Sequence, residues 1–120
     1  MKKISVLKKR KDFVRVAKGV KSIRNTLLLM AARSLCEEEC EPKVGYTTTK
    51  KIGKANVRNR ARRRLRAAVA EVFPRFAQNN VEYVLVGRWN TATCPFDMLK
   101  KNLISALKFV AKELKNEQVN

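Results

Sequence analysis

Histidine is absent from this sequence, and its absence limits the chemistry that the chain can perform. Histidine is the most frequent general base in enzymes and the usual partner of a cysteine nucleophile. A structural zinc site normally takes about four Cys or His ligands, whereas the chain has only Cys36, Cys40 and Cys94. We therefore expect no catalytic residue and no metal ligand among the protein's own side chains.

Long apolar segments are also missing. No run approaches the ~20 residues that a membrane-spanning helix needs, and the longest candidate, residues 27–32, has the length of a strand. The N-terminus lacks the apolar core of a signal peptide. These absences predict a cytoplasmic protein, in which the three cysteines would be free thiols.

Acidic residues are few. Ten Asp and Glu face 28 Lys and Arg, which gives a net charge of +18, while the hydrophobic content of 45% is ordinary for a globular protein. The length of 120 residues suits a single domain, residues 1–120. Self-repulsion on this scale is relieved by a polyanion, so a nucleic acid is the first candidate partner and an anionic membrane surface the second.

The residue pattern predicts an α+β domain with the order α-β-β-α-β-α and one small sheet covered by helices. Pro74 is expected to end or kink the second helix, and the acidic segment 37–41 to form a solvated loop. The expected elements are a helix at 9–18, strands at 26–33 and 43–49, a helix at 54–73, a strand at 81–87 and a last helix from Pro95.

The second predicted helix is dense in arginine. Residues 50–66 contain nine basic residues and no acid. Arg58, Arg62 and Arg66 repeat at one-turn intervals, and each like-charged pair at this spacing destabilises a helix by ~0.2–0.5 kcal/mol. An apolar stripe within an arc of about 120° lies on the other side of the helical wheel, and it consists of Val57, Ala61, Leu65, Ala68, Val69 and Val72.

This uncompensated charge predicts that the helix binds a polyanion. Arginine offers a planar set of donors that suits phosphate and stacks on bases. A helix that reads the major groove of DNA usually belongs to a compact helical module, whereas this helix follows a strand and shares its fold with a sheet. The arrangement favours RNA recognised by shape and backbone.

The basic segment resembles the signature of the bacterial ribonuclease P protein subunit. The residues that carry the resemblance are Lys50-Lys51-Ile52-Gly53-Lys54-Ala55, Val57-Arg58-Asn59-Arg60 and Arg62-Arg63-Arg64-Leu65-Arg66. The likeness extends over nearly the whole chain, from the segment 7–13 through Val44-Gly45 to the last strand and helix. It implies the same α-β-β-α-β-α order and a left-handed βαβ crossover, against the common right-handed rule.

The resemblance implies a protein subunit of ribonuclease P. Its partners would be the catalytic RNA and precursor tRNA, with no obligate protein partner evident. The RNA, with Mg²⁺ that it mainly holds itself, would remove the 5′ leader endonucleolytically. The RNA-binding residues implied by the motif are Lys50, Lys51, Lys54, Arg58, Asn59, Arg60, Arg62, Arg63 and Arg66.

The resemblance also implies a cleft for the single-stranded leader, formed by the first helix and a face of the sheet. Ala17 and Met30 depart from the family, which often has aromatic residues at both positions. An alternative for Phe13, Leu28 and Met30 is plain core packing. The implied cleft residues are Phe13, Ala17, Leu28, Met30, Lys43 and Thr47.

Two other functions compete with this interpretation. A structural RNA-binding protein of the ribosome would have a similar composition, but the long signature at residues 50–66 disfavours it. A free-standing nuclease would need paired carboxylates, and the acidic residues form no recognisable metal-binding pair.

Overall fold

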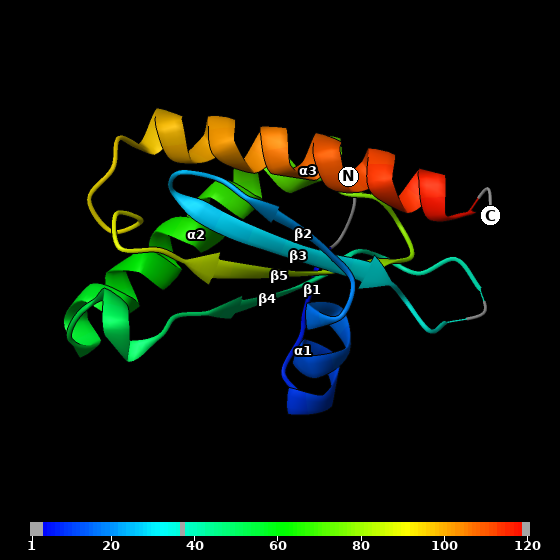
Figure 1. Cartoon of the computed structure of the whole chain (residues 1–120), viewed down its shortest axis with the longest axis horizontal. Coiled ribbons are helices and arrows are strands. Elements are labelled where there is room, and N and C mark those ends of the chain that lie inside the picture. The colour runs from blue at the N-terminus through cyan, green and yellow to red at the C-terminus, as the bar shows by residue number, and fades with distance from the viewer. Residues whose placement is uncertain (1–3, 37, 119–120) are drawn as a thin grey trace.

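The computed structural model describes residues 4–36 and 38–118. Five strands and three α-helices follow one another along this part of the chain, with one short 3₁₀ helix, η1, before the second α-helix (Figure 1). The elements are β1 (Ser5–Val6), α1 (Arg10–Ala17), β2 (Val20–Ile23), β3 (Leu27–Arg33), β4 (Lys43–Thr47), η1 (Lys50–Ile52), α2 (Ala55–Phe76), β5 (Val81–Gly87) and α3 (Phe96–Gln118).

The strands form one mixed sheet in the order β1-β4-β5-β3-β2, with β5 in the centre. β3 runs antiparallel to β5, and β2 antiparallel to β3. β4 lies parallel to β5 and is joined to it through α2, since parallel neighbours need a crossover connection. The α+β class and the order of the three helices agree with the sequence prediction, while the left hand expected for the crossover stays a prediction.

The two faces of the sheet carry different helices. Leu29, Tyr83 and Leu85 belong to a large core shared with α2 and α3. Val84 and Val86, which point to the opposite face because side chains alternate along a strand, pack with α1 in a smaller cluster. Figure 1 shows α3 running along one side of the sheet and α1 standing alone on the other.

A buried ion pair attaches α1 to the central strand. The Arg15 guanidinium pairs with the carboxylate of Glu82 and donates a hydrogen bond of 3.1 Å to the carbonyl of Arg33. Ser34 donates to the second oxygen of Glu82 at 3.0 Å. Glu82 is only 4% exposed, so its charge depends on these partners rather than on water.

The sheet has two strands that the sequence pattern did not predict. β1 has two residues and pairs with β4, and β2 pairs with β3 at the opposite edge. Both are too short to show a clear period-two pattern, with two residues in β1 and four in β2. They become strands because a partner backbone lies beside them, which is a tertiary effect. The predicted strands at 26–33 and 43–49 are confirmed with slightly shorter bounds, Leu27–Arg33 and Lys43–Thr47.

The prediction that Pro74 ends or kinks α2 is wrong about the end, because the helix continues to Phe76. A proline in the last turn removes one backbone donor but leaves the preceding turns intact. Phe73 is fully buried and meets the ring of Tyr83 edge-on with 5.1 Å between centroids. This packing continues the helix past the position where local propensity would end it.

The expectation of three free thiols is also wrong. Cys36 and Cys40 form a disulfide, and only Cys94 is a free, buried thiol. Asn80 binds the 36–40 loop through hydrogen bonds to the backbone of Cys40 and to the carbonyl of Glu38. The pairing depends on this loop conformation, which neither cysteine spacing nor composition reveals.

No helix within residues 4–36 and 38–118 combines the length and the apolar content that crossing a membrane requires.

Replacing Glu82 with glutamine should destabilise the fold by about 1–3 kcal/mol, because Arg15 loses the negative charge that offsets its own. Denaturant unfolding measures this loss. Glu71→Gln is the matched control, since Glu71 lies on the surface with its side chain 55% exposed and pairs with Lys100 at 3.6 Å. Its loss should stay below about 1 kcal/mol. Equal losses in the two variants would contradict a special role for the buried pair.

Candidate nucleic-acid interface

The arginine helix α2 is held by its apolar stripe. Ala61, Leu65 and Ala68 are completely buried, and Val69 and Val72 are 4% exposed. The first turn contains no acidic residue, and the N-cap, Lys54, makes no side-chain capping bond. Local interactions therefore do little to stabilise the start of this helix, and packing against the sheet compensates for the repulsion along its other side.

Three arginines of α2 turn toward the segment that leads out of β4. Arg58 donates to the carbonyl of Gly53 at 3.3 Å, and Arg62 donates to the hydroxyl of Thr48 at 2.7 Å. The guanidinium carbon of Arg66 lies 5.3 Å from the ring centroid of Tyr46. We call Arg58, Arg62 and Arg66 the arginine row; its one-turn spacing is the one predicted from the sequence.

The arginine row keeps its full positive charge. In the described part of the chain, ion pairs form at Arg15 and Lys100, and none forms at an arginine of α2. The partners of the row are a carbonyl, a hydroxyl and an aromatic ring, all neutral. Burial raises the pKa of Tyr46 to about 12, although the nearby Arg66 charge acts in the opposite direction. The phenol therefore remains uncharged and cannot neutralise the row.

Two hollows of about 430 Å³ each lie on the basic surface of α2. Asn59, whose amide oxygen accepts a hydrogen bond from Arg62, lines one of them. The other adjoins Phe96 at the start of α3, and Arg64 there donates to the carbonyl of Cys94. The first hollow is lined by Asn56, Asn59, Arg62, Arg63 and Arg66, and the second by Arg60, Arg63, Arg64, Ala67 and Phe96.

The three lysines of the predicted RNA-binding set lie at the entrance to the helix. Lys50 and Lys51 belong to η1, Lys54 is the N-cap of α2, and all three are exposed. Asn56 and Phe96 were not predicted as site residues. Asn56 lies inside the signature but carries no charge, and Phe96 comes from a distant part of the sequence that only the fold brings to the helix.

Another hollow, of about 520 Å³, opens between α1 and the sheet. We call it the α1 cleft. It brings together four of the six residues predicted for a leader-binding site, namely Phe13, Ala17, Met30 and Thr47. Its other lining residues are Lys8, Arg10, Val14 and Val84.

The two remaining predicted residues lie outside the lining of the α1 cleft. Leu28 precedes Met30 by two positions on β3 and so lies on the same face of the sheet, half-buried. Lys43 shares its face of β4 with Thr47 but stands at the other end of the strand, in register with Glu82. Lys8 and Arg10 were missed as lining residues, although the density of basic residues near the N-terminus is visible in the sequence.

Gly45 makes room for the aromatic ring of the α1 cleft. A Cβ atom at this position would lie 2.5 Å from Cζ and 2.8 Å from Cε1 of Phe13. The ring therefore lies directly against the backbone of β4. Phe13 is partly exposed and lines the cleft while it also packs on the smaller core, so core packing and ligand contact are compatible roles for it.

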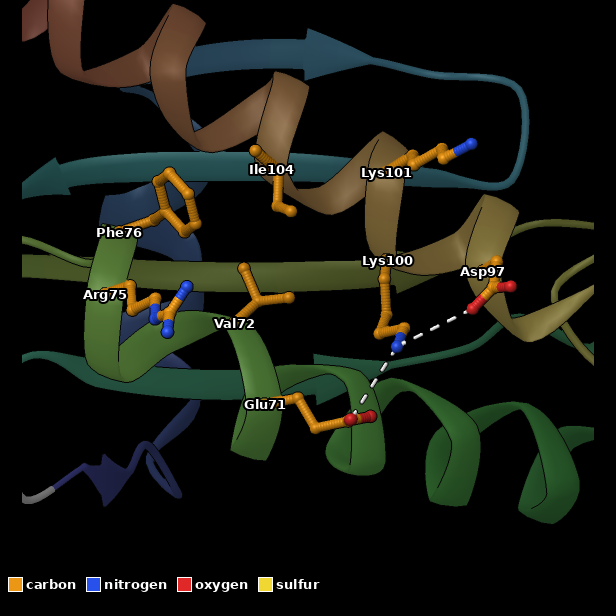
Figure 2. Close-up of a pocket in the computed structure, with 8 residues that line it drawn as sticks. All are labelled: Glu71, Val72, Arg75, Phe76, Asp97, Lys100, Lys101 and Ile104. Carbon is orange, nitrogen blue, oxygen red and sulfur yellow. Dashed lines mark ion pairs between the residues drawn. The ribbon is translucent and has the colours of Figure 1, made fainter.

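A further hollow, of about 470 Å³ between α2 and α3, is lined by both acidic and basic side chains. Figure 2 shows the Lys100 amine pointing between the carboxylates of Glu71 and Asp97. The Lys100 nitrogen lies 3.6 Å from an oxygen of each. Positive and negative charges alternate here, so this groove lacks the one-signed potential that attracts a polyanion.

The described residues are equipped for binding. No three His, Cys, Asp or Glu side chains among them gather where they could hold a metal ion. An unneutralised arginine row beside a cleft with an aromatic wall and basic rim instead matches what single-stranded and folded RNA require, namely cations for phosphates and a flat face for bases. The fold is that of a small α+β protein, and the chemistry of these two surfaces suits RNA.

Comparison with known proteins identifies the family. The family model described as Ribonuclease P matches residues 1–111, and the chain belongs to this family. The ribonuclease P protein component of Paramagnetospirillum magneticum is 42% identical over 107 residues, which cover 87% of this chain and 80% of that protein. The corresponding protein of Ruegeria pomeroyi is 41% identical over 106 residues, with 88% and 85% covered.

Solved structures show the same fold. The ribonuclease P protein of Thermotoga maritima superimposes with a TM-score of 0.73 at 18% identity, covering 88% of this chain and 97% of that one. The Staphylococcus aureus protein gives a TM-score of 0.71 at 21% identity, covering 89% and 95%. Through its family, the chain is a component of ribonuclease P, the endoribonuclease that processes the 5′ ends of tRNA.

The two tyrosines of the chain provide a test of the packing around the site. Burial raises the pKa of Tyr46 and of Tyr83 from 10.0 to about 12. Because folding favours the protonated phenols, their contribution to stability is complete below pH 10 and is lost as the pH rises toward 12. Ultraviolet absorbance should therefore show phenolate near pH 12 in the folded protein, and Tyr46→Phe should remove half of the signal. Ionisation near pH 10 before unfolding would show that the rings are solvated.

Proposed function

We propose that the basic surface of α2 binds the catalytic RNA of ribonuclease P and that the α1 cleft binds the single-stranded 5′ leader of precursor tRNA. The protein thereby assists endonucleolytic removal of the leader. The observation that carries the proposal is the arginine row, which has neutral partners and no acidic one within the described residues.

The neutral partners of the arginine row orient the guanidinium groups without satisfying them. Arg62, for example, uses one terminal nitrogen on Thr48 and the other on Asn59, while each guanidinium has five N–H donors in total. Donors therefore remain for phosphate oxygens. The residues proposed to contact the catalytic RNA are Lys50, Lys51, Lys54, Arg58, Asn59, Arg60, Arg62, Arg63 and Arg66.

The α1 cleft combines the two features that an unpaired strand needs. Phe13 offers an aromatic face on which a base can stack, an interaction worth ~1–3 kcal/mol. Lys8 and Arg10 on its rim are exposed and available to phosphates. Ala17, Met30 and Thr47 form the remaining contact surface, and Leu28 and Lys43 extend it along the same sheet face.

The Mg²⁺ that ribonuclease P chemistry implies does not fit a site on the described part of this chain, because no cluster of three potential ligands is present there. We propose that the RNA subunit holds it. The protein's residues then position RNA and reduce repulsion between phosphates. Association with these RNAs would place the protein in the cytoplasm.

Replacing any residue of the arginine row with alanine should weaken binding to a bacterial ribonuclease P RNA and lower the salt dependence of that binding. Each lost phosphate contact should reduce the slope of log K against log salt by about one unit. Filter binding over a salt series measures the slope. Arg75→Ala is the matched control, since Arg75 is exposed on the same helix but lines the mixed-charge groove of Figure 2. Slopes unchanged in all three row variants would refute the docking surface.

Replacing Phe13 with alanine should weaken binding of precursor tRNA to the reconstituted holoenzyme by about five- to hundred-fold, while mature tRNA binds as before. The reason is that only the precursor carries a leader to stack on the ring. Phe109→Ala is the control, because Phe109 is a 40% exposed aromatic on α3, away from the α1 cleft. Equal losses for precursor and mature tRNA would mean that Phe13 serves the core alone.

A further inference from the structure

Trp89 is the only tryptophan of the chain, and it is 70% exposed. It lies in the loop between β5 and α3, directly before the buried residues Asn90, Thr91 and Ala92. A large aromatic side chain in water forfeits the burial that normally stabilises it, and exposed tryptophans are typical of binding surfaces.

The loop around Trp89 is ordered by a dense set of hydrogen bonds. The hydroxyl of Thr91, which is completely buried, accepts from the amide of Arg88 at 2.7 Å and donates to the carbonyl of Thr26 at 2.6 Å. The carbonyl of Asn90 accepts from the amide of Cys94 at 2.9 Å. The loop therefore presents Trp89 on a fixed backbone, so a ligand need not order this segment when it binds.

The position of the loop links it to both proposed RNA surfaces. Arg64 of the arginine helix donates to the carbonyl of Cys94, and the Asn90 amide donates to Asn25 in the β2–β3 turn at 3.3 Å. A Cβ atom on Gly87, two residues before Trp89, would lie 2.9 Å from Thr48. Figure 1 shows this loop, the β2–β3 turn and the start of α2 at the same end of the sheet.

The loop that carries Trp89 follows the end of β5 that adjoins the α1 cleft. Val86 belongs to that face and pairs in register with Thr47, a residue of the cleft. Trp89 follows Val86 by three positions, which corresponds to at most about 10 Å of chain. A strand that leaves the cleft at Thr47 therefore emerges near the start of the loop that carries Trp89.

The electrostatic surroundings favour an anionic strand. Residues 83–96, which include the loop, contain no Asp or Glu, and residues 13–36, which include the β2–β3 turn, contain none either. Arg88 and Arg24 supply positive charge in these two segments. The Arg24 guanidinium is engaged with Ser105 and the ring of Phe109 on α3, so Arg88 is the cation next to Trp89 in the loop. An exposed aromatic ring beside a cation, in a segment without acids, is a pattern that binds unpaired nucleotides.

We propose that Trp89 is a second stacking platform, which binds an unpaired base of the 5′ leader after the strand has left the α1 cleft. Phe13 is the only aromatic residue that lines the cleft itself, so a platform at Trp89 doubles the number of bases that this surface can stack. The inference rests on the proposed leader site and extends it along the end of the sheet.

The experiment uses holoenzyme reconstituted from the protein and a bacterial ribonuclease P RNA, with precursor and mature tRNA as probes. Trp89→Ala should raise the Kd of precursor tRNA by about five- to hundred-fold and leave that of mature tRNA unchanged. Trp89→Phe should restore most of the affinity, since it keeps an aromatic face. Leu35→Ala is the matched control, because Leu35 is 77% exposed and follows β3 at the opposite end of the sheet.

Fluorescence gives an independent readout, because every tryptophan signal comes from Trp89. Precursor tRNA should quench the holoenzyme, and mature tRNA should not. An unchanged precursor Kd in Trp89→Ala, or quenching by the catalytic RNA alone together with weaker assembly, would overturn the inference. Measuring Phe13→Ala in the same assay separates the two proposals: a precursor-specific loss at Phe13 but not at Trp89 overturns the platform alone, and no such loss at either residue overturns the leader site as well.

Discussion

The central strand β5 is buried on both faces, and both parts of the candidate site are built on it. Tyr83 and Leu85 pack against the layer that holds the arginine helix, while Glu82 and Val84 face α1 and the smaller core. Pairing with β3 on one side and β4 on the other fixes the orientation of these alternate residues. A shift of the pairing register of β5 by one residue would turn each of its side chains to the opposite face of the sheet. The Glu82 carboxylate would then lie in the apolar core.

The charge of the protein is tolerated because it is separated from the core. α2 buries a narrow stripe of small and medium apolar residues and keeps its arginines outside, oriented by Thr48, Tyr46 and the backbone of Gly53. These partners restrict the guanidinium groups without neutralising them. The arginines therefore repel one another, which makes α2 weak as an isolated element, and a polyanion bound as we propose would relieve this repulsion.

The α1 cleft depends on how α1 is attached to the sheet and on the space left beside it. The Arg15–Glu82 ion pair, with Ser34 as a further donor, holds α1 on the sheet in a setting where an unpaired carboxylate would be costly. Gly45 leaves space for Phe13 to lie against β4. Because α1 covers only part of this face, Met30 and Thr47 stay accessible beside the ring. Arg15 thus attaches α1 to the sheet, while Phe13 of the same short helix lines the open cleft.

The sequence by itself determined the three helices, the three longer strands, the stripe that α2 buries and the one-signed charge of its other side, because periodicity and charge are local properties of the chain. Only the tertiary structure decided the edge strands β1 and β2, the continuation of α2 through Pro74 and the Cys36–Cys40 pairing, since each depends on contacts with a neighbouring element and not on the pattern of the segment itself. The same holds for the arginine helix itself. Its arginines could be read from the sequence, but the residues that orient or adjoin them come from β4, the segment after it and the start of α3, which only folding brings to its side. These residues are Tyr46, Thr48 and Phe96.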